Sequence, residues 1–207
     1  MILEHNHSGK LFILSGPSGA GKGTICKRLL EETDLQLSIS MTTRAPREGE
    51  IHGIHYYFVS EEEFVDRIEK DGFLEHAQVY GNRYGTPKEP VLEKLSQGID
   101  VILEIDIQGA LKVKENYPDG VFIFILPPSM SELRKRLTGR GTETAEAIEM
   151  RLGETLKELS FIEKYDYCVV NGDLEEAASR VKSIVIAEHS KVTITAEQLV
   201  EKYKEEK

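Results

Sequence analysis

A glycine-rich segment near the start of the chain constrains its fold more than any other feature. The segment Gly16-Pro-Ser-Gly-Ala-Gly-Lys-Gly-Thr24 follows the apolar run Lys10–Ser15 and precedes apolar residues at helical spacing. A strand, a tight glycine turn and a helix in this order aim successive backbone N–H groups and the positive end of the helix dipole at one point. The segment therefore predicts a phosphate-binding loop in a parallel α/β fold, with Lys22 reaching the outer phosphates.

The residue after the lysine departs from the general phosphate-loop pattern. That pattern places Ser or Thr there to bind magnesium, whereas this chain has Gly23, and the next hydroxyl belongs to Thr24. Two alternatives follow. Either Thr24 supplies the hydroxyl, or the ion is held mainly through water and phosphate.

The rest of the chain alternates apolar runs with helical patterns. Further buried strands are expected at Val101–Ile105, Val121–Leu126 and Tyr167–Val170, and the alternation of Leu35, Leu37, Ile39 and Met41 predicts one half-exposed strand. Helices are expected at 90–97, 108–116, 129–138 and 145–164. Buried strands alternating with helices indicate a parallel sheet covered by helices on both faces.

Two stretches do not follow this alternation. Residues from about 40 to 86 contain short strands with polar edges, such as His55–Val59, around one helix at Glu61–Lys70. Residues 129–164 are helical and rich in Arg and Glu, and they open with the capping sequence Ser129-Met-Ser-Glu132. Both stretches are interpreted as lobes inserted into one α/β core.

Composition limits the possible partners. Lys and Arg total 26 against 36 Asp and Glu, a formal net charge of −10. This balance disfavours a nucleic-acid or anionic-membrane binder, because such proteins need a broad positive surface. Anionic substrates must instead be held by local clusters of cations.

The sequence also carries expectations about location and metal binding. It has no apolar run near the ~20 residues that span a bilayer, and its first eight residues do not resemble a signal peptide, so a soluble cytoplasmic protein is expected. Cys26 and Cys168 lie within apolar patterns and are predicted to be buried, reduced thiols. The six histidines show no metal-ligand spacing.

A second candidate phosphate pocket follows the first. The loop Thr43-Arg-Ala-Pro-Arg-Glu-Gly49 carries two arginines three residues apart, Arg44 and Arg47. Guanidinium groups match phosphate oxygens two at a time, and Tyr56 and Tyr84 can add phenolic donors. Alone, such a loop is more often solvated surface. Beside a phosphate-binding loop it becomes a candidate site.

Taken together, the motifs resemble those of the guanylate kinases, enzymes that convert GMP and ATP to GDP and ADP. The matching segments run in the family's order over about Leu11 to Ile186, and the Gly-Lys-Gly-Thr variant of the loop is one of them. They are GPSGAGKGT at 16–24, SISMTTRAPREGE at 38–50, HYYF at 55–58, FLEHAQ at 73–78, YGT at 84–86, LEIDIQG at 103–109 and RLTGRGTET at 136–144.

The resemblance implies an organisation for the chain. The chain would have a P-loop NTPase-type α/β fold, a parallel sheet with helices on both faces, in one guanylate kinase-like domain over residues 1–207. The core would occupy about 9–39, 87–128 and 165–190, with an inserted GMP-binding lobe at about 40–86. A helical lid would lie at about 129–164, and a C-terminal helix at about 195–205.

Binding residues follow from the same resemblance. ATP would be bound by the loop Gly16, Pro17, Ser18, Gly19, Ala20, Gly21, Lys22, Gly23 and Thr24, and by Asn171. The GMP phosphate would meet Arg44, Arg47, Tyr56 and Tyr84, and the guanine ring would meet Ser40, Glu75, Thr86 and Asp106. The chemistry agrees, because guanine presents N1–H and N2–H side by side and one carboxylate, Glu75, can accept both. Adenine would leave that carboxylate facing a ring nitrogen.

Catalytic residues are implied as well. Lys22 and the lid arginines Arg136, Arg140 and Arg151 would stabilise the transferring phosphoryl group. Arg136 and Arg140 would be neighbours at i,i+4 if their helix continues that far. The Mg²⁺ that accompanies ATP would be held mainly by phosphates and water, with Thr24 and Glu104 as candidate contributors, while Asp106 is assigned to the acceptor side.

The implied activity is direct in-line transfer of the ATP γ-phosphate to GMP, and also to dGMP, in purine nucleotide metabolism and GMP recycling. The partners are then small nucleotides, with no nucleic acid and no membrane. Two alternatives remain open. A non-catalytic scaffold with this fold could lose Lys22 and the lid arginines, yet all are present. A kinase for AMP or UMP is disfavoured by Glu75 together with Ser40 and Thr86.

Overall fold

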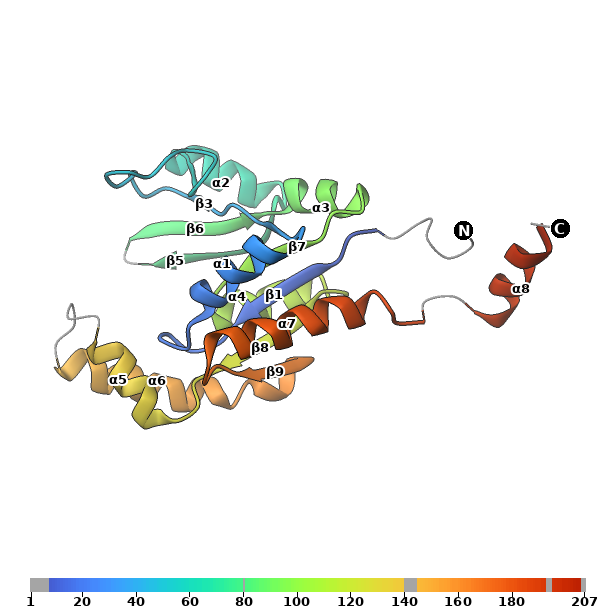
Figure 1. Ribbon diagram of the computed structural model, residues 1–207. Coiled ribbons are helices and arrows are strands. Elements are labelled where there is room, and N and C mark those ends of the chain that lie inside the picture. The colour runs from blue at the N-terminus through green and yellow to red at the C-terminus, as the bar shows by residue number, and fades with distance from the viewer. Residues whose placement is uncertain (1–7, 80, 140–144, 193–194, 206–207) are drawn as a thin grey trace.

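The protein is built on a five-stranded parallel sheet, shown in the computed structural model of Figure 1. The structure describes residues 8–79, 81–139, 145–192 and 195–205. Across the sheet the strands follow the order β2 (Gln36–Leu37), β7 (Val101–Glu104), β1 (Leu11–Ser15), β8 (Val121–Leu126) and β9 (Tyr167–Val170). Every neighbouring pair is parallel.

Both faces of this sheet are covered because alternate residues of the central strand β1 point to opposite sides. Phe12 and Leu14 belong to one buried cluster, which includes residues of α1 (Lys22–Glu32) and α7 (Leu174–Glu188). Leu11 and Ile13 belong to a second cluster, with residues of α3 (Lys88–Ser96) and α4 (Ile107–Asn116). Helices on both faces confirm the predicted α/β class.

A smaller four-stranded sheet lies beside the first. Its order is β4 (Tyr57–Phe58), β3 (Met41–Thr42), β6 (Asn82–Pro87) and β5 (Phe73–Val79), and it is mixed in direction. The helix α2 (Glu61–Glu69) begins at a capping box formed by Ser60 and Glu63. Phe64 of α2 stacks on Phe73 of β5 with ring centroids 4.5 Å apart, and Met41 completes this separate core.

Two helices that follow β8 form a third unit. The helix α5 (Met130–Thr138) begins at Ser129, whose hydroxyl accepts the Glu132 N–H as its sequence predicts. It packs on α6 (Ala145–Leu159) through a cluster of Leu133, Leu137, Ile148 and Leu152. The chain returns to the large sheet through a short 3₁₀ turn at Ile162–Lys164. The final helix, α8 (Ala196–Glu205), lies apart from the body (Figure 1).

Three sequence expectations need correction. The single strand expected from Leu35 to Met41 is two strands, since β2 belongs to the large sheet and β3 to the small one. The expected helix over 145–164 ends at Leu159, before the 3₁₀ turn. Cys168 is exposed, unlike the buried Cys26, because β9 is an edge strand in which only Val169 is buried. Within the described ranges, no helix has the length and apolar character needed to cross a bilayer.

Replacing Phe64 with Ala should lower the free energy of unfolding by about 3–5 kcal/mol, because the ring is fully buried and its removal leaves a cavity in the small core. Urea denaturation measures this change. The control is Ile186→Ala, at a side chain 60% exposed on α7, which should change stability by less than about 0.5 kcal/mol. Equal effects of the two substitutions would contradict the assignment of a separate core to the smaller sheet.

Candidate active site

The glycine-rich loop joins the carboxyl end of β1 to the start of α1, as predicted. Lys22 is the first residue of α1, and its ammonium donates hydrogen bonds to the carbonyl oxygens of Gly16 (2.6 Å) and Pro17 (3.1 Å). Gly21 caps the helix with φ 93°, a conformation that side-chain-bearing residues rarely adopt. The loop is therefore a preformed concave turn with its lysine folded along it.

Asn171 supports the loop from the end of β9. Its side chain is only 5% exposed, and its amide Nδ2 donates to the Ala20 carbonyl at 2.8 Å. A Cβ atom added to Gly21 would lie 2.3 Å from that Nδ2, so the close packing of Asn171 also requires glycine there. The structure thus gives Asn171 a supporting contact with the loop, which is additional to its predicted place on the ATP side.

The α5–α6 pair presses directly on the loop. Two leucines of α5, Leu133 and Leu137, would meet a Cβ on Gly19 at 2.8 and 3.0 Å. From the same helix, Arg136 donates to the Asn171 carbonyl at 2.9 Å, and from α6 Arg151 donates to the Ser18 hydroxyl at 2.9 Å. Two of the three predicted lid arginines are thus brought to the phosphate loop.

The third lid arginine, Arg140, lies outside the described residues. The helix α5 ends at Thr138 with Gly139 as its cap, so the described helix does not extend to 140. The i,i+4 pairing of Arg136 with Arg140 therefore has no support from the helix bounds. Arg136 is oriented instead by Glu132, one turn earlier, at 3.4 Å.

The space beside Gly23 is taken by an acidic side chain. A Cβ at Gly23 would lie 3.4 Å from both carboxylate oxygens of Glu104, which follows the last buried residues of β7. Thr24, which follows Gly23 in α1, is exposed. Carboxylate and hydroxyl oxygens are hard donors that suit Mg²⁺, which also keeps several waters and phosphate ligands, so these residues fit that ion. Among the described residues, no cluster of three or more His, Cys, Asp or Glu is placed to hold a metal.

A cavity of about 260 Å³ lies between the small sheet and the start of α4. Five of the eight residues predicted for GMP line it, together with small and apolar side chains. The lining residues are Ser40, Tyr56, Glu75, Ala77, Val79, Tyr84, Gly85, Ile105, Asp106 and Gly109. The cavity therefore joins residues from the smaller sheet to residues that follow β7.

Glu75 is the buried acid of this cavity. Its side chain is 8% exposed, and the Thr86 hydroxyl donates to its Oε1 at 2.7 Å across the β5–β6 pair. Burial raises the pKa of the Glu75 carboxyl above its ordinary value of 4.5, and the nearby Asp106 carboxylate adds to the rise. The Thr86 hydrogen bond and Lys112 act in the opposite direction. The other oxygen of Glu75, Oε2, faces Gly109.

Asp106 also has a structural role, which the sequence did not reveal. It is the N-cap of α4, and its Oδ1 accepts the Gly109 N–H at 2.7 Å. The same carboxylate lines the cavity. An N-cap contact fixes the orientation of the side chain at the positive end of a helix, so Asp106 is held in place beside Glu75.

The two arginines of the predicted pair differ in their exposure to solvent. Arg44 is half-buried, with its guanidinium over the Tyr56 ring at 5.6 Å and paired with Glu50 at 2.8 Å. This hydrogen bond from Arg44 is the main reason that the pKa of Glu50 falls to about 2. Tyr84 packs edge-on against Tyr56 at 6.1 Å between ring centroids. The Arg47 side chain is exposed, and its backbone N–H also binds Glu50 at 2.7 Å.

Sequence reasoning missed Glu158, a half-buried acid on α6. Burial raises the pKa of its carboxyl, the positive charge of Lys22 opposes the rise, and Glu154 and Asp106 add to it. Glu158 is therefore under the electrostatic influence of both Lys22 and Asp106. Its spacing could have revealed it, because a residue seven positions after Arg151 lies on the same helical face.

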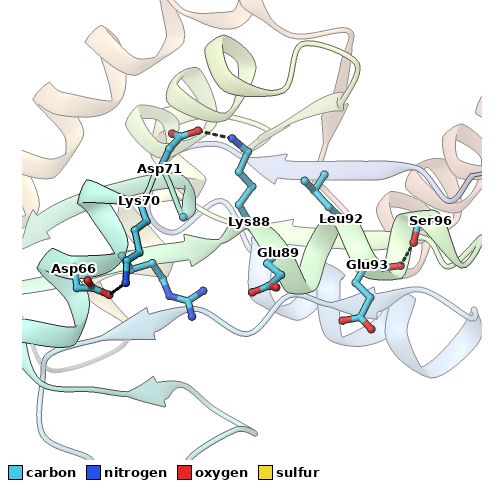
Figure 2. Close-up of a pocket in the computed structure, with 10 residues that line it drawn as sticks. Asp66, Lys70, Asp71, Lys88, Glu89, Leu92, Glu93 and Ser96 are labelled. Atoms are coloured by element: carbon cyan, nitrogen blue, oxygen red, sulfur yellow. Dashed lines mark hydrogen bonds and ion pairs between the residues drawn. The ribbon is translucent and has the colours of Figure 1, made fainter.

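A wider groove, of about 850 Å³, lies elsewhere between α2 and α3 and is shown in Figure 2. Its charged residues include two close ion pairs, Lys70 with Asp66 and Lys88 with Asp71, each at 2.7 Å. It contains none of the residues predicted to bind nucleotide. Its size therefore does not make it the candidate active site.

The phosphate loop follows the carboxyl end of β1, and the acidic cavity lies beside the carboxyl end of the parallel strand β7. Open α/β folds bind their ligands at this end of their strands. This arrangement is that of a P-loop nucleotide-binding protein. The family model for guanylate kinase matches residues 8–188.

Similar proteins agree. The guanylate kinase of Caldanaerobacter subterraneus subsp. tengcongensis is 60% identical over 185 residues, covering 89% of this chain and 90% of that protein. That of Clostridium acetobutylicum is 54% identical over 193 residues, covering 93% and 92%. The crystal structure of guanylate kinase from Anaplasma phagocytophilum superposes with a TM-score of 0.71 at 39% identity, covering 90% of this chain and 89% of that one.

The chain belongs to the guanylate kinase family, whose members are transferases that phosphorylate GMP to GDP with ATP. The resemblance drawn from its motifs is therefore confirmed.

The raised pKa of Glu75 can be measured directly. Carboxyl-carbon NMR titration should show Glu75 and Glu158 titrating above 4.5, and only the Glu75 signal should disappear in Glu75→Gln. Thr86→Val removes the hydrogen bond that stabilises the carboxylate, so it should move the midpoint to still higher pH. The control is Glu62→Gln, at an exposed residue of α2, which should leave the titration midpoint of Glu75 unchanged. A Glu75 midpoint at or below 4.5 would contradict the burial of this acid.

Proposed function

We propose that this protein transfers the γ-phosphate of ATP directly to GMP, with dGMP as a second acceptor. The observation that carries the proposal is the buried Glu75 in the cavity beside Asp106. Guanine presents N1–H and N2–H on one edge, and a carboxylate accepts both, while adenine presents a ring nitrogen at the first position. A base lacking the expected donors leaves a buried carboxylate unpaired, which disfavours its binding.

The chain's own residues then divide into donor and acceptor sides. On the donor side, the loop amides and Lys22 bind the ATP phosphates, with Arg136 and Arg151 beside the loop. On the acceptor side, Arg44, Tyr56 and Tyr84 form one cluster suited to the GMP phosphate, with Arg47 joining from the exposed loop. Ser40 and Thr86 complete the base site.

Transfer in line needs little covalent work from the protein. The GMP phosphate is largely ionised at neutral pH, so its oxygen can attack without a general base. The cations of Lys22 and the arginines neutralise charge on the transferring group. Mg²⁺, when bound with ATP, supplies further charge neutralisation, and Thr24 and Glu104 are the residues suited to orient it or its waters.

The proposal assigns a role to each part of the fold. The large sheet is the core, at about 9–39, 87–128 and 165–190, and the small sheet at about 40–86 is the GMP-binding lobe. The helices of about 129–164 are the lid that excludes water from the reaction. The product would be GDP, which places the reaction in purine nucleotide metabolism and GMP recycling.

A coupled assay of ADP formation tests the function with GMP, dGMP, AMP, UMP and CMP as acceptors. GMP should exceed AMP in kcat/KM by about 100-fold or more. Lys22→Ala should lower kcat by about 100-fold or more without unfolding the protein, because the lysine acts on transition-state charge. The control Lys27→Ala changes an exposed lysine on the same helix and should retain full activity. Preference for another monophosphate, or full activity of Lys22→Ala, would refute the proposal.

Ligands should also compact the protein. The cations that must meet the two nucleotides come from different lobes, and phosphates are needed to bring like charges together. Small-angle scattering should therefore give a smaller radius of gyration with GMP, with an ATP analogue, and most of all with both. A radius that stays constant across all four conditions would contradict the role given to the two lobes.

A further inference from the structure

Gly109 lines the cavity close to both of its acids, Glu75 and Asp106. It is the third residue of α4 and is buried. An added Cβ atom would lie 3.4 Å from Glu75 Oε2, 3.4 Å from Asp106 Oδ1 and 3.5 Å from the Cδ1 of Ile105. The hydrogen atom that replaces this Cβ therefore points at the space between the two carboxylates.

Neither the backbone nor crowding accounts for a glycine at this position. Gly109 is not among the described glycines with positive φ, and its helical conformation suits any L-residue. Alanine is the better helix former. The three distances correspond to ordinary van der Waals contact, so a methyl group fits without displacing the backbone. The remaining reason for glycine is the volume that it leaves free in the cavity.

The chemistry around that volume indicates what occupies it. Two carboxylates converge there, one buried and one oriented by its N-cap hydrogen bond. A group with two N–H donors on one atom can satisfy both acids at once. In a guanine nucleotide, that group is the exocyclic 2-amino group, which sits next to N1–H. Hypoxanthine keeps N1–H and the 6-oxygen and lacks only this amino group.

We infer that Gly109 is a specificity-determining residue that reserves space for the 2-amino group of guanine between Glu75 and Asp106. The inference rests on the proposed function, because it concerns the acceptor base of that reaction. Gly109 also donates its N–H to Asp106, and alanine retains this donor. Substitution by alanine therefore changes the volume of the site without removing either acid or its hydrogen bond.

The test compares GMP with inosine monophosphate as acceptors for the wild type and Gly109→Ala. The kcat/KM for GMP should fall about tenfold or more, as expected when one methyl group crowds a fitted pocket. The kcat/KM for inosine monophosphate should stay within about twofold, as should the KM for ATP. The melting temperature of the variant should equal or exceed that of the wild type, because α4 gains a better helix former.

The matched control is Gly153→Ala, in the interior of α6, where nothing lies within 4 Å of an added Cβ. It should raise helix stability in the same way and leave the ratio of GMP to inosine monophosphate unchanged. Equal losses for the two acceptors in Gly109→Ala, or no loss for either, would overturn the role of Gly109 and leave the proposed function intact. A wild type that phosphorylates neither acceptor would overturn the proposed function itself.

Discussion

The parallel pairing of β1 with β7 is the contact on which the site depends. Its register places Leu14 opposite Glu104, so both strands end at the same level of the sheet. The phosphate loop continues from β1, while Glu104, Asp106 and the start of α4 continue from β7. Because β1 is wholly buried between two covered faces, a slip of its register would move every packed side chain to the opposite core. The proposed donor and acceptor sites are thereby held side by side.

Cations around the proposed site are paired with nearby oxygen atoms. Three described cations of the proposed site have local oxygen partners: Lys22 has loop carbonyls, Arg44 has Glu50, and Arg136 has Glu132 and the Asn171 carbonyl. These partners hold cations near where phosphates would bind in a protein of net charge −10. A phosphate that replaced the carbonyl partners of Lys22 and Arg136 would exchange neutral acceptors for a charged one, which forms stronger hydrogen bonds with cations.

The helical pair α5–α6 shows how packing brings distant residues to the loop. It has a small core of its own, yet Leu133 and Leu137 also pack on Gly19. This contact positions Arg136 and Arg151 at the loop, although both are more than 100 residues away in the sequence. The absence of a side chain on Gly19 is what allows the helix to approach so closely. Glycine in this loop therefore accommodates the packing of α5 as well as the tight turn.

The sequence alone determined the parallel α/β class and the phosphate loop, because strands buried on both faces read as continuous apolar runs and the loop motif is local. It also determined the family through the order of its motifs. Only the tertiary structure divided Leu35–Met41 between two sheets, exposed Cys168 at an edge, buried Glu75 and brought Arg151 to Ser18. Burial and pairing of this kind depend on which segments become neighbours, and neighbours are set by long-range packing that no local pattern encodes.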